Sequence, residues 1–153
     1  MLLTPHALVG AAIGARLKHP LAVIPVAILS HFLLDTVPHW QETLSPYRPN
    51  QATWVRLPLD ALLALVGVAW IVRRSRKRGG RMLAASAIVG AVAGVVPDVD
   101  ALACANPLLL KHGLLSRYFF WHCGIQDETP TGWGVVTQAV VTLAALAVAT
   151  RKR

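Results

Sequence analysis

Charged side chains are scarce in this sequence. Only 14% of its 153 residues are Asp, Glu, Lys or Arg, whereas 55% are hydrophobic, and the mean hydropathy is +0.53. A typical soluble domain carries about 25% charged residues. The composition therefore argues against a soluble protein and favours a single membrane-embedded domain over residues 1–153.

Cysteine is also scarce. Cys104 and Cys123 are the only two, and their spacing is not that of a CxxC pair. A disulfide between them would need both to face an oxidising compartment, and nothing in the sequence requires one. The N-terminus has neither a basic region nor a small-residue cleavage site ahead of polar sequence, so we predict no signal peptide.

Acidic residues are few, with seven Asp and Glu against 15 Lys and Arg, for a net charge of +8. The basic residues are not spread over a surface. Most of them lie at 73–81, between two apolar runs, and at 151–153. This pattern is typical of positive charge beside a membrane, and no basic face interleaved with aromatic residues is apparent. We therefore expect no nucleic-acid partner.

Long apolar runs are what the sequence does contain. We predict helices over residues 4–17, 21–36, 54–72, 82–96 and 133–150, with one or two short helices within 107–121. Thr4 is the expected N-cap of the first helix, with Pro5 in its first turn. A membrane span needs about 20 apolar residues, so the third and fifth helices fit best. We predict an all-α, multipass membrane bundle of about five helices, some short or half-inserted.

The basic clusters also predict an orientation. Placing residues 73–81 and 151–153 on the cytoplasmic side of the plasma (inner) membrane puts the N-terminus outside and the C-terminus inside. The turn at 16–18 then falls on the cytoplasmic side as well. Nine chemistry-bearing residues are collected at the outer ends of the helices by this arrangement: His6, His31, Asp35, His39, Asp60, Asp98, Asp100, His112 and His122.

His31 and Asp35 are four residues apart on an apolar helix, so they share one face. A buried imidazole and carboxylate cost free energy unless a partner such as a divalent metal satisfies them. His39 continues the spacing, but Pro38 is expected to end the helix before it.

Two small-residue stripes lie near further candidates. Residues 10–14 (GAAIG) and 90–94 (GAVAG) match the small-xxx-small pattern that allows membrane helices to approach closely. His6 shares a face with the first stripe, and Asp98 shares a face with the second if the helix continues past Pro97. Each stripe thus points to a potential metal ligand.

Three segments together resemble a known family: residues 4–10 (TPHALVG), 30–39 (SHFLLDTVPH) and 95–100 (VVPDVD). They are similar to the bacterial membrane-bound metal-dependent hydrolases, an inner-membrane group with a LexA-binding member. The 31–39 element more distantly resembles the zinc-binding helix of zinc-dependent phospholipase C. The order of the elements is reversed relative to that group, and Ala101 stands where the group has a His.

The resemblance implies a hydrolase that uses metal-activated water, acting on a phosphoester-bearing membrane lipid or a related substrate at the extracytoplasmic face. The expected metal is Zn²⁺, with Mn²⁺ or another divalent ion as the alternative. The predicted ligands are His6, His31, Asp35, Asp98 and His122. Asp100 and His39 are predicted to act in catalysis. Asp60 and Gln126 are predicted to support the ligands by hydrogen bonds, and His112 and Arg56 to orient an anionic substrate.

Two other functions remain open from the sequence. The same residues could form the ion site of a metal-transport protein. They could also hold a metal only for folding in a catalytically inactive structural protein, an alternative that the missing His at Ala101 keeps in view.

Overall fold

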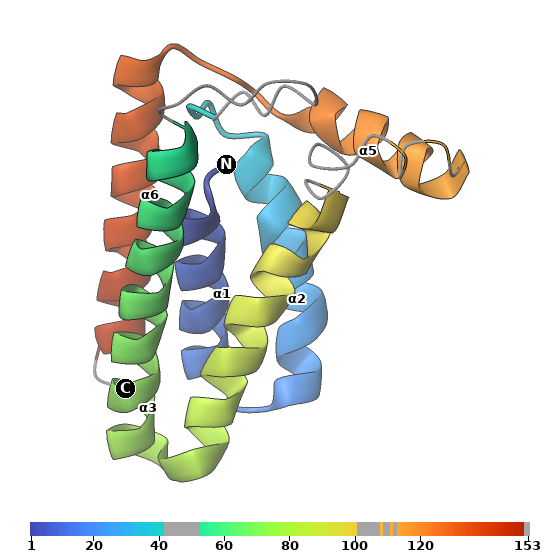
Figure 1. Cartoon of the computed structure of the whole chain (residues 1–153). Helices are drawn as coiled ribbons and strands as arrows, with labels where there is room; N and C mark the ends of the chain where they lie inside the picture. The colour runs from blue at the N-terminus through green and yellow to red at the C-terminus, as the bar shows by residue number, and fades with distance from the viewer. Residues whose placement is uncertain (42–52, 101–107, 109–110, 112, 152–153) are drawn as a thin grey trace.

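The computed structural model describes residues 1–41, 53–100, 108, 111 and 113–151, and the fold of this part is helical (Figure 1). The elements, in chain order, are α1 (Leu3–Leu17), α2 (Pro20–Asp35), α3 (Thr53–Val95), the 3-10 helix η1 (Val96–Asp100), α5 (Gly113–Ile125) and α6 (Thr131–Thr150). The predicted all-α class is confirmed. Cys104 lies outside the described residues, so the structure does not test a disulfide between Cys104 and Cys123.

The element α3 consists of two helical limbs. The backbone leaves helical geometry at Gly79 and Gly80, where the chain turns back on itself (Figure 1). Gly80 has φ of 70°, a left-handed conformation that residues with a Cβ rarely adopt. The sequence predicts a basic loop over residues 73–81, but the first limb continues through the arginines and the reversal needs only the two glycines.

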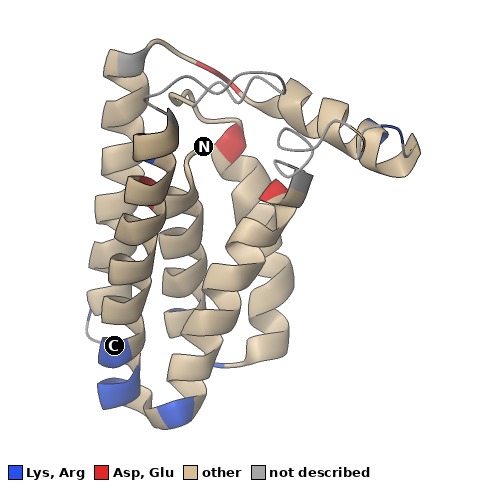
Figure 2. Ribbon diagram, viewed as in Figure 1, with Lys and Arg blue, Asp and Glu red and all other residues tan. Residues whose placement is uncertain are grey.

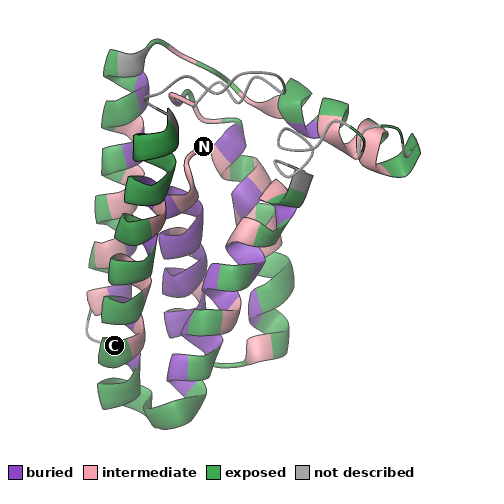
Figure 3. Ribbon diagram, in the orientation of Figure 1, coloured by how far each residue is buried: buried purple, intermediate pink, exposed green. Residues whose placement is uncertain are grey.

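The helix α1 lies at the centre of the bundle. It packs against α2, against α3 and against α6, and it is the most continuously buried helix (Figures 1 and 3). Small side chains allow this close packing. The core cluster contains Leu8, Ala11, Ala12 and Ala15 of α1, together with Ile71, Ala87, Ala91, Ala145 and Ala149.

The two glycine stripes, each predicted to allow close helix approach, pack against each other. A Cβ added to Gly10 would overlap the main-chain carbonyl of Gly90, and one added to Gly14 would overlap that of Ser86. A Cβ on Gly94 would lie 2.7 Å from the carbonyl oxygen of His6. The second limb of α3 is therefore in backbone contact with α1 along its length, and this contact continues up to the first predicted metal ligand.

Two helices in the described part are long and apolar enough to cross a membrane. The first candidate is Trp54–Val99, which covers α3 and most of η1, and the second is Gly132–Thr150 in α6. In the most apolar 18-residue stretch of each candidate, only 17% and 22% of the residues, respectively, are buried in the protein, whereas the core helix of a soluble protein is mostly buried. α2 is apolar but shorter. The additional spans of the predicted multipass bundle stay a prediction.

The N-terminus of α1 is capped by Asp60 from α3. The Asp60 carboxylate accepts hydrogen bonds from Leu3 N at 2.8 Å and Thr4 N at 3.3 Å. Thr4, the predicted N-cap, instead lies inside α1 and donates its hydroxyl to the Asp60 carbonyl at 2.8 Å. A carboxylate at a helix N-terminus satisfies orphan N–H groups and complements the helix dipole. This contact, rather than a bond to a ligand histidine, accounts for the burial of Asp60.

Removing this cap is expected to destabilise the bundle. Asp60→Ala should lower the free energy of unfolding by about 1–2 kcal/mol, the effect of losing a helix cap. Denaturation in detergent, followed by far-UV circular dichroism, measures the change. Asp127→Ala is the matched control, because the Asp127 side chain is exposed and its main chain makes its hydrogen bonds. Equal destabilisation by the two variants would contradict the capping role.

Candidate metal centre

The five predicted metal ligands lie together at one end of the bundle. They come from four elements: His6 from α1, His31 and Asp35 from α2, Asp98 from η1, and His122 from α5. The side chains of all but Asp98 are buried, whereas the Asp98 side chain is 26% exposed. His31 and His122, which are 91 positions apart in the chain, thus share one buried polar site that is surrounded by apolar helices.

The Asp35 carboxylate is the centre of this site. Its Oδ2 lies 3.0 Å from Nε2 of His31 and 3.0 Å from Nε2 of His122. The two Nε2 atoms are themselves 3.1 Å apart. On the other side, Oδ1 lies 3.1 Å from Nε2 of His6 and 2.6 Å from the Met1 nitrogen. Three imidazoles therefore surround one carboxylate.

The orientation of His31 is typical of a metal ligand. Its Nδ1 lies 2.8 Å from the carbonyl oxygen of Gly94. A carbonyl can only accept, so Nδ1 carries a proton and donates it. In the neutral ring this leaves the lone pair of Nε2 directed at Asp35 and His122. Metal-binding histidines are usually held in this way, by a hydrogen bond from the nitrogen that does not bind the metal.

The triangle of donor atoms has room for a proton or a metal cation, while the N-terminal ammonium of Met1 pairs with the other oxygen of Asp35 at 2.6 Å. A lone pair on His31 Nε2 would face the Asp35 carboxylate oxygen at 3.0 Å, which is repulsive unless a proton or a cation lies between them. Tetrahedral zinc bound at about 2.0–2.1 Å separates neighbouring donors by roughly 3.3 Å. The observed sides of 3.0, 3.0 and 3.1 Å are close to that separation.

Two overlapping sets of side chains have the geometry to hold an ion. One is His31, Asp35 and His122, and the other is His6, His31 and Asp98; in each set one donor atom per residue lies within 4.8 Å of the others. Imidazole nitrogen and carboxylate oxygen are donors that zinc accepts readily. The residues present therefore fit a divalent metal.

Tyr118 positions His122 and was not predicted from the sequence. Its hydroxyl donates to the carbonyl oxygen of Pro97 at 2.7 Å, and its ring stacks on the His122 ring with centroids 5.5 Å apart. His122 is the one buried residue that α5 contributes, so this helix brings a single polar group to the site. The i, i+4 spacing of Tyr118 and His122 could have identified the pair.

His39, a predicted catalytic residue, has a different environment. It is fully buried, its Nδ1 donates to the Val37 carbonyl at 2.7 Å, and it belongs to neither of the two sets of candidate ligands. Its main chain pairs with residues 127 and 129 in an isolated bridge that joins the end of α2 to the segment before α6. These contacts give His39 a role in closing this end of the bundle.

Arg56 and Gln126, the other predicted residues whose side chains the structure describes, belong to neither set of candidate ligands. Arg56 is exposed and lies over the Trp40 ring at 5.4 Å. Gln126 has a buried Oε1 with no hydrogen-bond partner in the described part of the chain. Asp100 belongs to η1, but its side chain lies outside the described residues, as does His112.

Comparisons with protein families, curated proteins and solved structures give no significant match to this chain. The resemblance to the metal-dependent hydrolases therefore rests on the three sequence segments alone.

Proposed function

We propose that this protein is a membrane-bound metalloprotein that binds a divalent cation, zinc in the first place, at one end of its helical bundle. The proposed ligands are His6, His31, Asp35, Asp98 and His122. The observation that carries the proposal is the triangle of His31 Nε2, His122 Nε2 and Asp35 Oδ2, with its sides of 3.0–3.1 Å. The hydrogen bond from His31 to Gly94 supports it, because it frees Nε2 for the metal.

We further propose that the bound metal serves hydrolysis. Zinc lowers the pKa of a bound water so that hydroxide forms near neutral pH. Asp98 is the proposed ligand nearest to solvent, since its Oδ1 lies 3.6 Å from His31 Nε2 and its side chain is 26% exposed, so water would reach the metal on this side. The substrate class we propose is a phosphoester-bearing lipid or a related molecule.

Membrane placement has separate support. Large apolar side chains are exposed along α3 and α6, including Leu65 and Leu143 at 68% and 65%. Most lysine and arginine in the described part lies at one end of the bundle, with a smaller amount on α5, whereas Asp and Glu lie toward the end opposite the main basic cluster (Figure 2). We propose a multipass arrangement with the basic end cytoplasmic and the metal centre at the extracytoplasmic face.

One observation favours a second candidate function. The side chains of His6, His31, Asp35 and His122 are all 0–1% exposed, as is usual for a metal that only holds a fold together. Under this candidate the ion stabilises the bundle and no substrate reaches it.

The first test is metal content. Detergent-purified protein should retain zinc near one equivalent, measured by inductively coupled plasma mass spectrometry, and His31→Ala should lose it because the triangle loses a corner. His19→Ala is the control, since His19 is exposed in the turn between α1 and α2. If zinc neither remains bound nor raises the melting temperature when added, the metal proposal fails.

The second test separates the two candidates. Zinc-loaded protein is offered bis(4-nitrophenyl) phosphate, and release of nitrophenolate is followed by absorbance. Turnover that disappears in His31→Ala supports hydrolysis. Full zinc occupancy without turnover, for this substrate and for phospholipid vesicles, supports the structural metal instead.

A further inference from the structure

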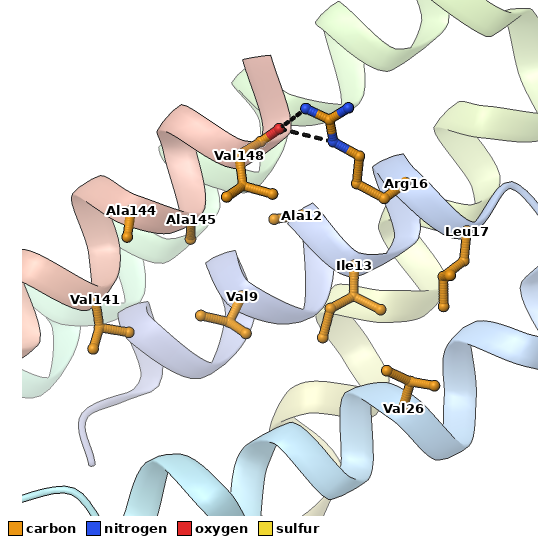
Figure 4. A pocket seen from close by; sticks show the side chains of 10 residues that line it. All are labelled: Val9, Ala12, Ile13, Arg16, Leu17, Val26, Val141, Ala144, Ala145 and Val148. Atoms are coloured by element: carbon orange, nitrogen blue, oxygen red, sulfur yellow. Dashed lines mark hydrogen bonds between the residues drawn. The ribbon is translucent and has the colours of Figure 1, made fainter. Parts of the chain in front are cut away.

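A groove lies along the C-terminal half of α1, which is the half farther from the metal centre. It has a volume of about 400 Å³ and is bounded by α1, α2 and α6 (Figure 4). Aliphatic side chains such as Ile13, Val26 and Val141 line its walls, and Ala144 and Ala145 give it depth. The size falls in the range of about 300–1,000 Å³ that is usual for small-molecule sites. The surface is therefore apolar, concave and large enough for one ligand.

Arg16 is the one charged residue among the described residues that line the groove. Its Nε donates to the Val148 carbonyl at 2.9 Å, and its Nη2 donates to the same carbonyl (Figure 4). The Nη2 also donates to the Arg151 carbonyl at 3.0 Å. These bonds cap the C-terminus of α6 and hold the guanidinium at the end of the groove. The positive charge of Arg16 is therefore held at this end of the groove by hydrogen bonds.

Further positive charge surrounds this end. Lys18 follows α1 and Arg151 follows α6, and both are exposed. The acidic residues in the described part lie toward the other end of the bundle (Figure 2). An apolar groove that ends beside several cationic side chains is complementary to a molecule with a long hydrocarbon chain and an anionic head group.

We propose that the groove binds one acyl chain of an anionic phospholipid, with the lipid phosphate at Arg16, Lys18 and Arg151. This inference rests on the proposed membrane placement but is independent of the metal centre. One wall of the groove belongs to α6, a candidate membrane span. With almost no polar atoms in its lining, the groove offers water few partners, so in a bilayer a hydrocarbon chain fills it. Juxtamembrane Lys and Arg attract anionic lipid head groups electrostatically.

Native mass spectrometry of the detergent-purified full chain tests this directly. Palmitoyl-oleoyl phosphatidylglycerol or phosphatidylcholine is added, and the number of retained lipids is counted. We expect one retained phosphatidylglycerol and clearly less phosphatidylcholine. Ala144→Phe should abolish retention, because the ring occupies the groove. Ala139→Phe makes the same change at an exposed position of α6 outside the lining, and it should retain lipid as the wild type does.

The head-group site is tested by Lys18→Gln combined with Arg151→Gln. Loss of both charges should weaken phosphatidylglycerol binding on the order of tenfold or more, from about 1 kcal/mol per cation. Equal retention by Ala144→Phe and Ala139→Phe, or equal binding of the two lipids, overturns the proposal. So does a wild-type dimer that Ala144→Phe converts to a monomer, because a second copy then fills the groove.

Metal content of the same variants separates this inference from the proposed function. Ala144→Phe should keep its metal, since the groove lies at the other end of α1. If neither the wild type nor any variant contained metal but the wild type still retained lipid, only the metal proposal would be contradicted. Protein that stays soluble without detergent and retains no lipid would remove the membrane placement and this inference together.

Discussion

Asp35→Asn is expected to release the bound metal, with the largest loss of affinity of any single substitution in the site. Asp35 touches His6, His31 and His122 at once, so it is the one group that holds the donor triangle together. Asparagine keeps the shape but removes the negative charge that a divalent cation needs. Groups that only support a ligand already cost about 10–100-fold in metal affinity when removed. We therefore expect a loss of more than about 100-fold.

Competition with a chromophoric chelator measures this affinity. Asp60→Asn is the matched control, because Asp60 is also a buried carboxylate but serves the N-terminus of α1. It should lower stability and leave zinc binding nearly intact. If Asp60→Asn and Asp35→Asn lost zinc to the same extent, the effect would come from general destabilisation, and Asp35 would have no special place in the site.

The parts of the fold that could be predicted depend on local spacing. His31 and Asp35 share a face because they are four residues apart, and the helices are visible as apolar runs. The distribution of basic clusters also places His6, His31 and His122 at the same end, without any knowledge of contacts. The glycine stripes predict close helix approach because small residues let two backbones come near each other, and the structure pairs the two stripes.

What could not be predicted depends on partners distant in the chain. Asp60 caps α1 from 57 residues away, and its carboxylate looks the same in the sequence whether it meets a histidine or a helix end. The direction of His122 depends on how Tyr118 docks on η1, which no local pattern encodes. The predicted helix end at residue 72 is wrong, because α3 stays helical through the arginines up to Gly79: a cluster of charge indicates a membrane boundary but does not end a helix.

Gly90→Ala is expected to loosen the contact between α1 and α3, which positions the metal centre. The added Cβ would overlap the carbonyl oxygen of Gly10, lie 2.8 Å from the carbonyl carbon of Gly10 and lie 3.0 Å from Val23 Cγ1. Main-chain atoms cannot rotate away as a side chain would, so the two helices have to separate. Overpacking of this kind costs about 1–3 kcal/mol. Thermal denaturation in detergent should show a lower melting temperature.

Gly132→Ala provides the control that makes this prediction specific. A Cβ on Gly132 meets nothing within 4 Å, and in a helix the change from glycine to alanine is favourable by up to about 1 kcal/mol. It should leave stability unchanged or raise it. Because Gly10 and His6 share one face of α1, Gly90→Ala should also weaken zinc binding, whereas Gly132→Ala should not. Unchanged stability and zinc affinity in Gly90→Ala would mean that the backbone contact does not set the geometry of the site.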